Sequence, residues 1–212
     1  MYSEVITQEQ VTLPSIIRHE VSAVHPKNKA AAIATVVMGF STDPVARWVY
    51  QRAGQYLENF PAFIQAMAGN AFGAATAFAT SDLSGAALWL PPGVGSDEEA
   101  IVALIRETID EDIIDDVYRF VEQMDQNHPT EPHWYLPMIA VDTFRQNEGI
   151  GTALLRASLE RCDRDGLPAY LESSNPRNIS LYHRFGFVIV GEIQHGSSPT
   201  MYPMRREPNS FI

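Results

Sequence analysis

The order of hydrophobic and polar residues predicts helices in the first part of the chain and a strand-rich region after it. Apolar residues that recur three and four positions apart are typical of an amphipathic helix. Proline at the start of such a stretch and glycine at its end mark helix boundaries. These signals predict helices over 27–39, from Asp43-Pro44 to Val49, and over 59–68.

Shorter apolar runs bounded by turn residues predict strands. We expect a first strand over 13–19 and a hairpin of two strands over 74–80 and 86–90. Ser96 then opens a long helical region, whose apolar positions repeat every three or four residues as far as Met124. Many Asp and Glu residues lie between these positions, a pattern typical of a solvated helix face.

The last third of the chain alternates strands and helices. The nearly continuous apolar run 134–141 predicts a strand that is covered on both faces. A helix over 149–164 and a strand over 168–172 follow, and this order predicts a parallel crossover unit. Further short elements are expected after it: a helix over 178–185 and strands over 188–193 and 201–205.

Composition limits the class of protein. The 212 residues are 45% hydrophobic, which is ordinary for one globular domain. The net charge of −11 argues against a nucleic-acid surface, because phosphate binding needs clustered Lys and Arg. With Cys162 as the only cysteine, no intrachain disulfide and no zinc site of several thiolates can form. The chain has neither a signal-like start nor an apolar run long enough to span a membrane, so we expect a cytoplasmic protein. We also expect it to hold no metal.

A turn with two glycines carries the clearest chemical signal. The sequence Gln146-Asn147-Glu148-Gly149-Ile150-Gly151 follows one predicted strand and opens the next helix. Glycines let the backbone approach a ligand, and the free N–H groups at a helix start bind anions. The turn is therefore expected to bind a pyrophosphate. A dinucleotide fold is set aside because Leu154 occupies the third glycine position, and a P-loop because no Lys follows Lys29.

A second motif lies downstream of the turn. Asn175 stands seven residues before Tyr182, and Gly186-Phe187 follows. With both motifs in this order, residues 133–206 resemble the coenzyme-binding half of the GNAT superfamily of N-acetyltransferases, whose turn reads Gln/Arg-x-x-Gly-x-Gly/Ala. Within that superfamily, the segments 131–136 and 168–174 most resemble the sequences of puromycin N-acetyltransferases.

The resemblance implies an α/β (α+β) fold of the GNAT type. Its central mixed sheet would have about six or seven strands flanked by helices, with the coenzyme in a gap between two splayed parallel strands. A single domain would cover 1–212, with a variable acceptor-side half over about 1–130 and a coenzyme-binding half over about 131–206.

The resemblance also implies which residues bind acetyl-CoA. One strand would hold the pantetheine arm, the turn would wrap the pyrophosphate, and later residues would complete the site: Ile139, Ala140 and Val141; Gln146, Asn147, Glu148, Gly149, Ile150, Gly151 and Thr152; Asn175, Asn178, Tyr182 and Arg184. Glu148 departs from the family pattern, because a carboxylate near a pyrophosphate is electrostatically unfavourable. Arg145 or Arg184 is expected to offset that charge.

Acetyl transfer from a thioester needs a proton donor and a base. By the resemblance, Tyr182 would protonate the departing thiolate as general acid. Glu172 is the expected base for the amine. Three other candidates stay open for that role: Asp142, His128 and His133. Four aromatic residues either line an acceptor pocket or pack in the core: Trp89, Trp134, Tyr135 and Tyr170.

The sequence thus predicts an acetyl-CoA-dependent N-acetyltransferase that acetylates a primary amine of a small molecule by direct attack on the thioester. Two alternatives remain: a coenzyme A-binding regulatory or sensor module without turnover, and a protein N-acetyltransferase. No nucleic-acid or membrane partner is expected, and a homodimer is compatible with the sequence. The identity of the amine is not encoded in any motif.

Overall fold

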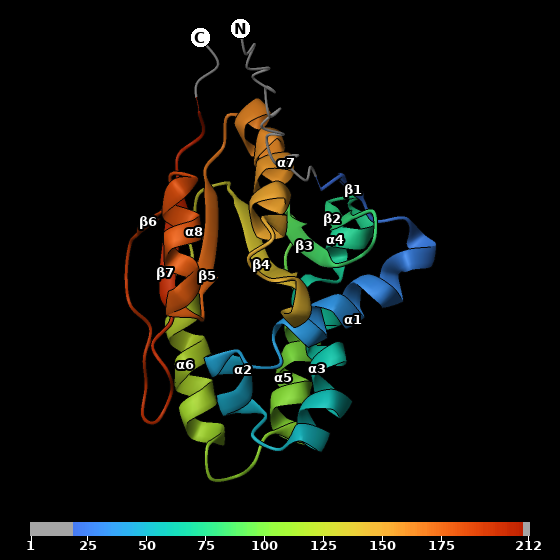
Figure 1. Cartoon of the computed structure of the whole chain (residues 1–212). Helices are drawn as coiled ribbons and strands as arrows, with labels where there is room; N and C mark the ends of the chain where they lie inside the picture. Colours follow the sequence, from blue (N-terminus) through green and yellow to red (C-terminus); the bar gives the residue numbers. More distant parts are fainter. Residues whose placement is uncertain (1–18, 210–212) are drawn as a thin grey trace, which may run out of the picture.

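The computed structural model describes residues 19–209, which form one mixed sheet flanked by helices (Figure 1). The sheet contains seven strands in the order β1-β2-β3-β4-β5-β7-β6. The strands are β1 (Val21–Ala23), β2 (Ala77–Thr80), β3 (Gly85–Leu90), β4 (Trp134–Val141), β5 (Ala169–Ser173), β6 (Val188–Ile189) and β7 (Tyr202–Arg206). The predicted strand over 13–19 lies outside the described residues except for His19.

Helices precede, interrupt and follow the strands along the chain. The α-helices are α1 (Lys29–Gly39), α2 (Pro44–Val49), α3 (Ala53–Ala68), α4 (Asn70–Gly73), α5 (Glu98–Thr108), α6 (Ile114–Asn127), α7 (Ile150–Asp165) and α8 (Ile179–Arg184). Short 3-10 helices add η1 (Pro26–Asn28), η2 (Thr143–Arg145) and η3 (Pro176–Asn178). Over residues 19–209, every helix is too short or too polar to cross a bilayer.

Several elements form where local signals predict them. Asp43 caps α2, because its side chain accepts the N–H groups of Val45 and Ala46. Strands β2 and β3 form the predicted antiparallel hairpin. Strand β4 occupies the predicted span 134–141, and it pairs in parallel with β5 across α7, which confirms the crossover unit.

Two helix predictions in the first half were wrong in their boundaries. The helix predicted over 59–68 begins at Ala53, so Pro61 lies inside it. Tyr56, Phe60 and Ile64 form one buried stripe at four-residue spacing, and this packing outweighs the hydrogen bond that Pro61 removes.

The long helical region from Ser96 is two helices, α5 and α6, separated by an extended residue at Ile109. Asp97 caps α5 by accepting the N–H of Ala100, while the Ser96 hydroxyl donates to the carbonyl oxygen of Met67. Both Ile109 and Ile113 are buried, so hydrophobic contacts hold the break in place.

The end of the sheet also differs from the prediction. The strand expected over 188–193 is confined to β6, which covers two residues, and only an isolated bridge joins Ile193 to Met201. Strand β7 does not follow β6 at the edge but lies between β5 and β6, antiparallel to both. This insertion places the last strand directly beside Glu172, which pairs with Pro203.

The two faces of the sheet carry separate hydrophobic clusters. Residues Ala86, Leu88 and Leu90 of β3 belong to a cluster with α1, α3 and α5, while Ala87 and Trp89 pack with α7. Figure 1 shows α2, α3, α5 and α6 gathered at the lower end of the sheet in that view, with α7 and α8 in front of it. The helices of the first half thus pack together beside the strands, on the other face of the sheet from α7.

A buried ion pair joins α7 to β7. The guanidinium of Arg206 donates to both carboxylate oxygens of Asp163 at 2.7 and 2.9 Å, and these side chains are 4% and 9% exposed. Burial by itself raises the pKa of Asp163, but hydrogen bonds from Arg206 and from the N–H of Asn209 outweigh it and lower the pKa. The carboxylate therefore stabilises the folded state more than the unfolded state.

We expect Asp163→Asn to lower the free energy of unfolding by about 3 kcal/mol, because it leaves a buried guanidinium without its counter-charge. Urea unfolding measures this change, and Glu160→Gln on the exposed side of the same helix is the control, with little effect. Since the pKa is lowered on folding, the wild-type advantage is full above a pH of about 4 and is lost as the pH falls further. Equal stability of the two variants would contradict the assignment.

Candidate functional site

The gap between β4 and β5 is the starting point of the site. The parallel ladder between the two strands holds two residue pairs, Trp134 with Ala169 and Tyr135 with Tyr170. Beyond them the ladder ends, so within residues 19–209 no residue of β4 from Leu136 onward is paired with β5. Unpaired N–H and C=O groups need other partners, which an extended ligand can supply.

A β-bulge in β4 accompanies this separation. Leu88 pairs with Met138 and Leu90 with Tyr135, so β4 has one residue more than β3 between these pairs. The extra residue reverses the faces: Leu136 packs on the α7 side, whereas Met138 packs on the α1 side. Pro137 lies in the bulge, where the missing N–H costs no ladder hydrogen bond.

A cavity of about 690 Å³ opens at this gap and runs between the glycine turn and the helices of the first half. The residues predicted to bind the coenzyme or to catalyse the reaction come together along it, with one exception. Those that line the cavity are Ile139, Ala140, Val141, Gln146, Asn147, Gly149, Ile150, Gly151, Thr152, Glu172, Asn175, Asn178, Tyr182 and Arg184. The exception is Glu148.

The glycine turn is built to present backbone donors. Asn147 and Gly149 have φ values of +66° and +85°, and Gly149 is the N-terminal cap residue of α7. A side chain on Gly149 would project into open space, with no atom within 4 Å. In the described part of the chain, no acceptor pairs with the N–H groups of 146–152. The start of α7 thus presents free backbone donors of the kind that anions bind at helix N-termini.

The carboxylate of Glu148 points away from these donors. It accepts a hydrogen bond from Nε of Arg145 at 2.7 Å, and Nη1 of Arg145 also donates to Asp82 at 3.2 Å. These contacts raise the pKa of Arg145, with the hydrogen bond to Glu148 as the largest cause. Of the two arginines expected to offset the charge of Glu148, Arg145 is the one that contacts it.

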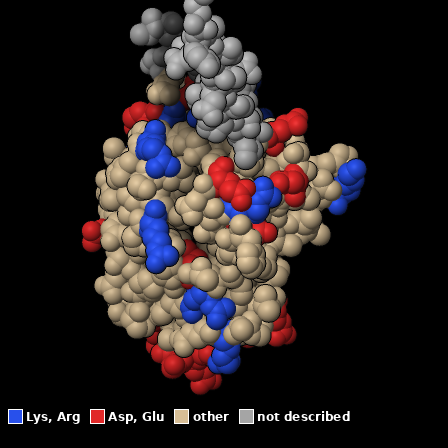
Figure 2. Space-filling model, viewed as in Figure 1, with Lys and Arg blue, Asp and Glu red and all other residues tan. Residues whose placement is uncertain are grey.

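Charged side chains are spread unevenly over this side of the molecule. Figure 2 shows the Lys and Arg side chains of this face as separate spots, whereas acidic side chains gather at the lower end, where α5 passes into α6. The visible face has no continuous basic surface of the kind that a nucleic-acid backbone needs.

Tyr182 provides a proton donor in the cavity. It lies on α8, is 5% exposed, and packs edge-on against Phe187 with ring centroids 6.1 Å apart. Among the described residues its hydroxyl has no hydrogen-bond partner, yet it is not sealed from solvent. Burial, followed by the charge of Asp43, raises the pKa of Tyr182, so the phenol keeps its proton at neutral pH.

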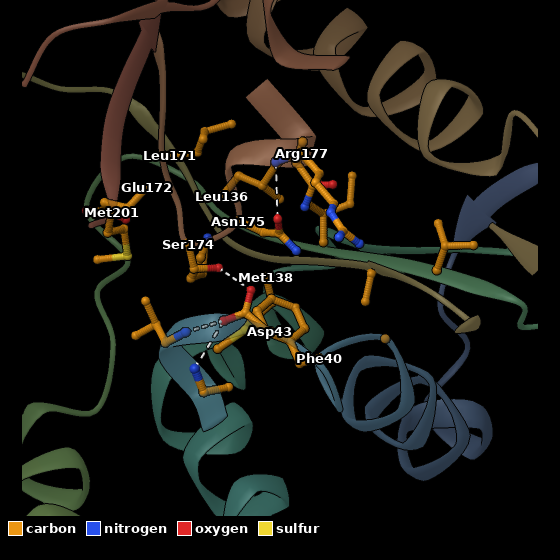
Figure 3. A pocket seen from close by; sticks show the side chains of 18 of the residues that line it. Phe40, Asp43, Leu136, Met138, Leu171, Glu172, Ser174, Asn175, Arg177 and Met201 are labelled. Atoms are coloured by element: carbon orange, nitrogen blue, oxygen red, sulfur yellow. Dashed lines mark hydrogen bonds between the residues drawn. The ribbon is translucent and has the colours of Figure 1, made fainter. Parts of the chain in front are cut away.

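Asp43 is a site residue that sequence reasoning placed only as a helix start. Its Oδ1 caps α2, and its Oδ2 accepts a hydrogen bond of 2.6 Å from the hydroxyl of Ser174, which follows β5 (Figure 3). Burial raises its pKa. The two residues are 131 positions apart, so no local pattern could reveal a contact that ties the first half of the chain to the edge of the gap.

Glu172 is the best placed of the candidate bases. It lies on β5 and lines the cavity, and its side chain is 3% exposed. Its Oε1 lies 3.6 Å from Nδ1 of His128 and, within residues 19–209, is sealed from solvent without a hydrogen bond. Asp142 instead caps η2, and neither Asp142 nor the two histidines line the cavity.

The four aromatic candidates separate into two groups. Trp89 and Trp134 pack against each other on the α7 side, with ring centroids 6.5 Å apart, and belong to the core. Tyr135 lines the cavity, while Tyr170 lies behind it against His128. Asn175 also faces the cavity, where its Oδ1 accepts the N–H of Arg177 (Figure 3).

Many solved structures share this fold, and the two that follow are distant in sequence. The chain is 21% identical to a Corynebacterium glutamicum protein named histone acetyltransferase HPA2 and related acetyltransferase, with a TM-score of 0.66 over 92% of this chain and 98% of that one. Arylalkylamine N-acetyltransferase 2 of Aedes aegypti gives 12% identity and a TM-score of 0.63 over 90% and 99% of the two chains. These likenesses establish the fold.

Sequence comparison establishes the family. Over 80 residues the chain is 35% identical to an uncharacterized N-acetyltransferase of Schizosaccharomyces pombe; the match covers 36% of this chain and 32% of that protein. The chain thus spans about a third of the length of this curated relative. A model of the Acetyltransferase (GNAT) family matches residues 71–187, which is more than half of the chain and includes both the glycine turn and Tyr182. The chain therefore belongs to the GNAT family of acetyltransferases.

Proposed function

We propose that this protein is an acetyl-CoA-dependent N-acetyltransferase that acetylates a primary amine of a small molecule. One observation supports this function above all others: a single cavity joins the free N–H groups of the glycine turn, the unpaired side of β4 and the hydroxyl of Tyr182. Such groups suit, in the same order, a diphosphate, a chain with amide groups and a departing thiolate.

The chemistry of the lining residues fits coenzyme A. The N–H groups of 146–152 would donate to the pyrophosphate, and the open space in front of Gly149 leaves room for it. Arg177 and Arg184 add positive charge along the same cavity. The backbone of Ile139–Val141 would hydrogen-bond the amides of the pantetheine arm. Two side chains beyond β5 would hold its cysteamine end: Asn175 and Asn178.

Tyr182 acts in this proposal as the general acid. When the amine nitrogen bonds to the thioester carbon and the C–S bond breaks, the sulfur takes the proton of the Tyr182 hydroxyl. The raised pKa of Tyr182 suits the role because the phenol enters the reaction protonated. A proton released by the nitrogen replaces the one that Tyr182 gives up, so the enzyme returns to its starting state.

Glu172 acts as the base that makes the amine nucleophilic. An ammonium group has no free electron pair, so one proton must leave before the attack. The Glu172 carboxylate lines the cavity, and its Oε2, unlike Oε1, is not sealed from solvent. It would receive this proton directly or through a water molecule.

Direct attack on the thioester agrees with the placement of the cysteine. Cys162 is the only cysteine of the chain, and it is buried against α7 neighbours away from the cavity. Burial raises the pKa of its thiol to about 12, so it is a poor nucleophile. An acetyl-cysteine intermediate is therefore not part of the proposal.

We expect Tyr182→Phe to reduce kcat by about 10²–10³-fold while the affinity for coenzyme A stays unchanged, because only the proton donor is lost. Thiol release from acetyl-CoA with a panel of primary amines measures the rate, and calorimetry measures binding. Tyr118→Phe, an exposed tyrosine on α6 outside the cavity, is the matched control.

The same assay tests the function itself. Tight acyl-CoA binding without thiol release from any amine would favour the sensor module, and release only with lysine peptides would favour a protein N-acetyltransferase. Equal rates in wild type and Tyr182→Phe would remove Tyr182 from the mechanism.

We expect Gly149→Ala to weaken coenzyme A binding about tenfold. A side chain at φ +85° strains the turn by about 1–2 kcal/mol, and its Cβ would occupy the space that we assign to the pyrophosphate. Gly54→Ala is the control, because Gly54 has an ordinary φ and equally open surroundings, and its coenzyme affinity should not change. An unchanged dissociation constant in Gly149→Ala would place the pyrophosphate elsewhere.

A further inference from the structure

The helices of the first half of the chain give the cavity apolar walls. These walls come from four helices that precede β4 in the sequence, α2, α3, α5 and α6. Six side chains represent them: Val49, Phe63, Met67, Ile105, Val121 and Met124. Among these, only Ile105 is fully buried in the core, and the others remain partly exposed toward the cavity side. A pocket of this kind favours an apolar ligand body.

Five charged residues line the cavity. The cavity is lined by three arginines, Arg145, Arg177 and Arg184, which lie in or near the motifs assigned to the coenzyme. The remaining charged lining residues are the carboxylates Asp43 and Glu172 (Figure 3). These carboxylates can stabilise an ammonium group, and among residues 19–209 no further carboxylate lines the cavity to pair with a second one.

We propose that the acceptor is a primary monoamine with an apolar alkyl or aryl body, and not a polycation. Its ammonium group lies against Glu172 and Asp43, and its body lies among Phe63, Met67 and Val121. This inference rests on the proposed acetyl transfer and adds the substrate class to it. Each further ammonium group of a polyamine or an aminoglycoside would lose its water against apolar walls without gaining a partner.

A panel of amines tests the class. Thiol release from acetyl-CoA is measured with phenethylamine and hexylamine against spermidine and kanamycin, and we expect kcat/KM at least about 100-fold higher for the monoamines. A higher kcat/KM for spermidine or kanamycin would overturn the class but leave acetyl transfer intact. Absence of release with every amine would overturn the proposed function and the class together.

A variant pair tests the location of the apolar body. Phe63→Ala should raise KM for phenethylamine about tenfold and leave KM for acetyl-CoA unchanged, because it removes only the wall of the acceptor end. Leu57→Ala on the same helix is the control: this exposed side chain does not line the cavity, and both KM values should stay at wild-type level. An unchanged KM for phenethylamine in Phe63→Ala would exclude this placement.

A separate chain of contacts leads from Glu172 to the surface. Nδ1 of His128 lies 3.6 Å from Oε1 of Glu172, and Nε2 of His128 lies 3.1 Å from Nε2 of His133. Nδ1 of His133 lies 2.8 Å from the carbonyl oxygen of Glu131. The side chain of His128 is 33% exposed, so it touches both the buried carboxylate and solvent.

When both histidines are neutral, these contacts fix the tautomer of each one. A carbonyl oxygen only accepts, so Nδ1 of His133 carries a hydrogen and donates it to Glu131. Neutral His133 therefore has a free electron pair on Nε2, and His128 must donate its Nε2 hydrogen to it. Neutral His128 is left with a free electron pair on Nδ1, the nitrogen that faces Glu172.

The groups around the two histidines agree with this arrangement. Burial lowers the pKa of His133, which favours its neutral form as the acceptor. Burial, followed by the Glu172 charge, raises the pKa of both Tyr135 and Tyr170, so these phenols stay neutral. Nearby charges come from three other groups: Asp125 on α6, and Glu131 with its partner Arg205 on β7.

The geometry points to a second role, independent of the acceptor class: His128 relays the ammonium proton from Glu172 to water. After the amine protonates Glu172, Nδ1 of His128 takes that proton, the carboxylate is regenerated, and the exposed imidazolium loses one proton to solvent. His133 is a positioning residue that returns His128 to the same tautomer. The relay rests on Glu172 acting as the base.

The relay is needed only when the acceptor arrives as an ammonium ion, and this allows a sharp test. We expect His128→Gln to reduce kcat/KM for phenethylamine about tenfold at pH 7, with recovery on adding imidazole, and to leave the rate with aniline, which is neutral at that pH, unchanged. His195→Gln, an exposed histidine paired with Asp116, is the control and should match wild type.

The possible outcomes distinguish a proton relay by His128 from a purely structural role of His128, and they test the role of Glu172 as the base separately. An equal loss with aniline, or no recovery with imidazole, would show that His128 only supports the fold and would overturn the relay. A normal rate for phenethylamine in Glu172→Gln would overturn the proposed base, and the relay with it, while leaving the acetyl transfer in place.

Discussion

The short ladder between β4 and β5 is the constraint on which the rest of the site depends. After two residue pairs the strands separate, and one extra residue at the bulge reverses the faces of β4. Leu136 is therefore the last fully buried residue of β4 on the α7 side, whereas Met138 and Ala140 pack on the α1 side. The ladder ends at this point and the cavity opens there, so the cavity and the unpaired edge of β4 accompany the same irregularity.

The two halves of the chain contribute opposite properties to this cavity. Local backbone geometry in the second half supplies free N–H groups and arginines, which favour anions. The first half supplies apolar helix faces and Asp43. The Asp43–Ser174 hydrogen bond joins them at the gap, so the loop after β5 is held by a residue that lies before α2.

Features that depend on neighbouring residues could be predicted from the sequence, whereas features that depend on distant contacts could not. The apolar run 134–141 and the start of α7 at Gly149 follow from local composition and turn chemistry. The bulge did not, because an unbroken apolar run carries no alternation in which a shifted register is visible. Pro61 led to a helix start that was too late, because the buried Tyr56–Phe60–Ile64 stripe holds the helix together on both sides of the proline. Asp43 was missed because its partner is 131 residues away.

The opening also explains how the proposed acid and the proposed base, which lie on opposite faces of one sheet, can reach the same cavity. Tyr182 packs in the cluster on the α7 side. Glu172 shares its face with Tyr170, two residues earlier on β5, and Tyr170 packs in the cluster on the α1 side. In a continuous sheet the strand layer would lie between two such groups, since side chains on its two faces point in opposite directions. Where β4 leaves β5 that layer is interrupted, and both side chains reach one cavity. In the proposed reaction, this arrangement lets proton delivery to sulfur and proton removal from nitrogen take place on the two sides of one reacting carbon.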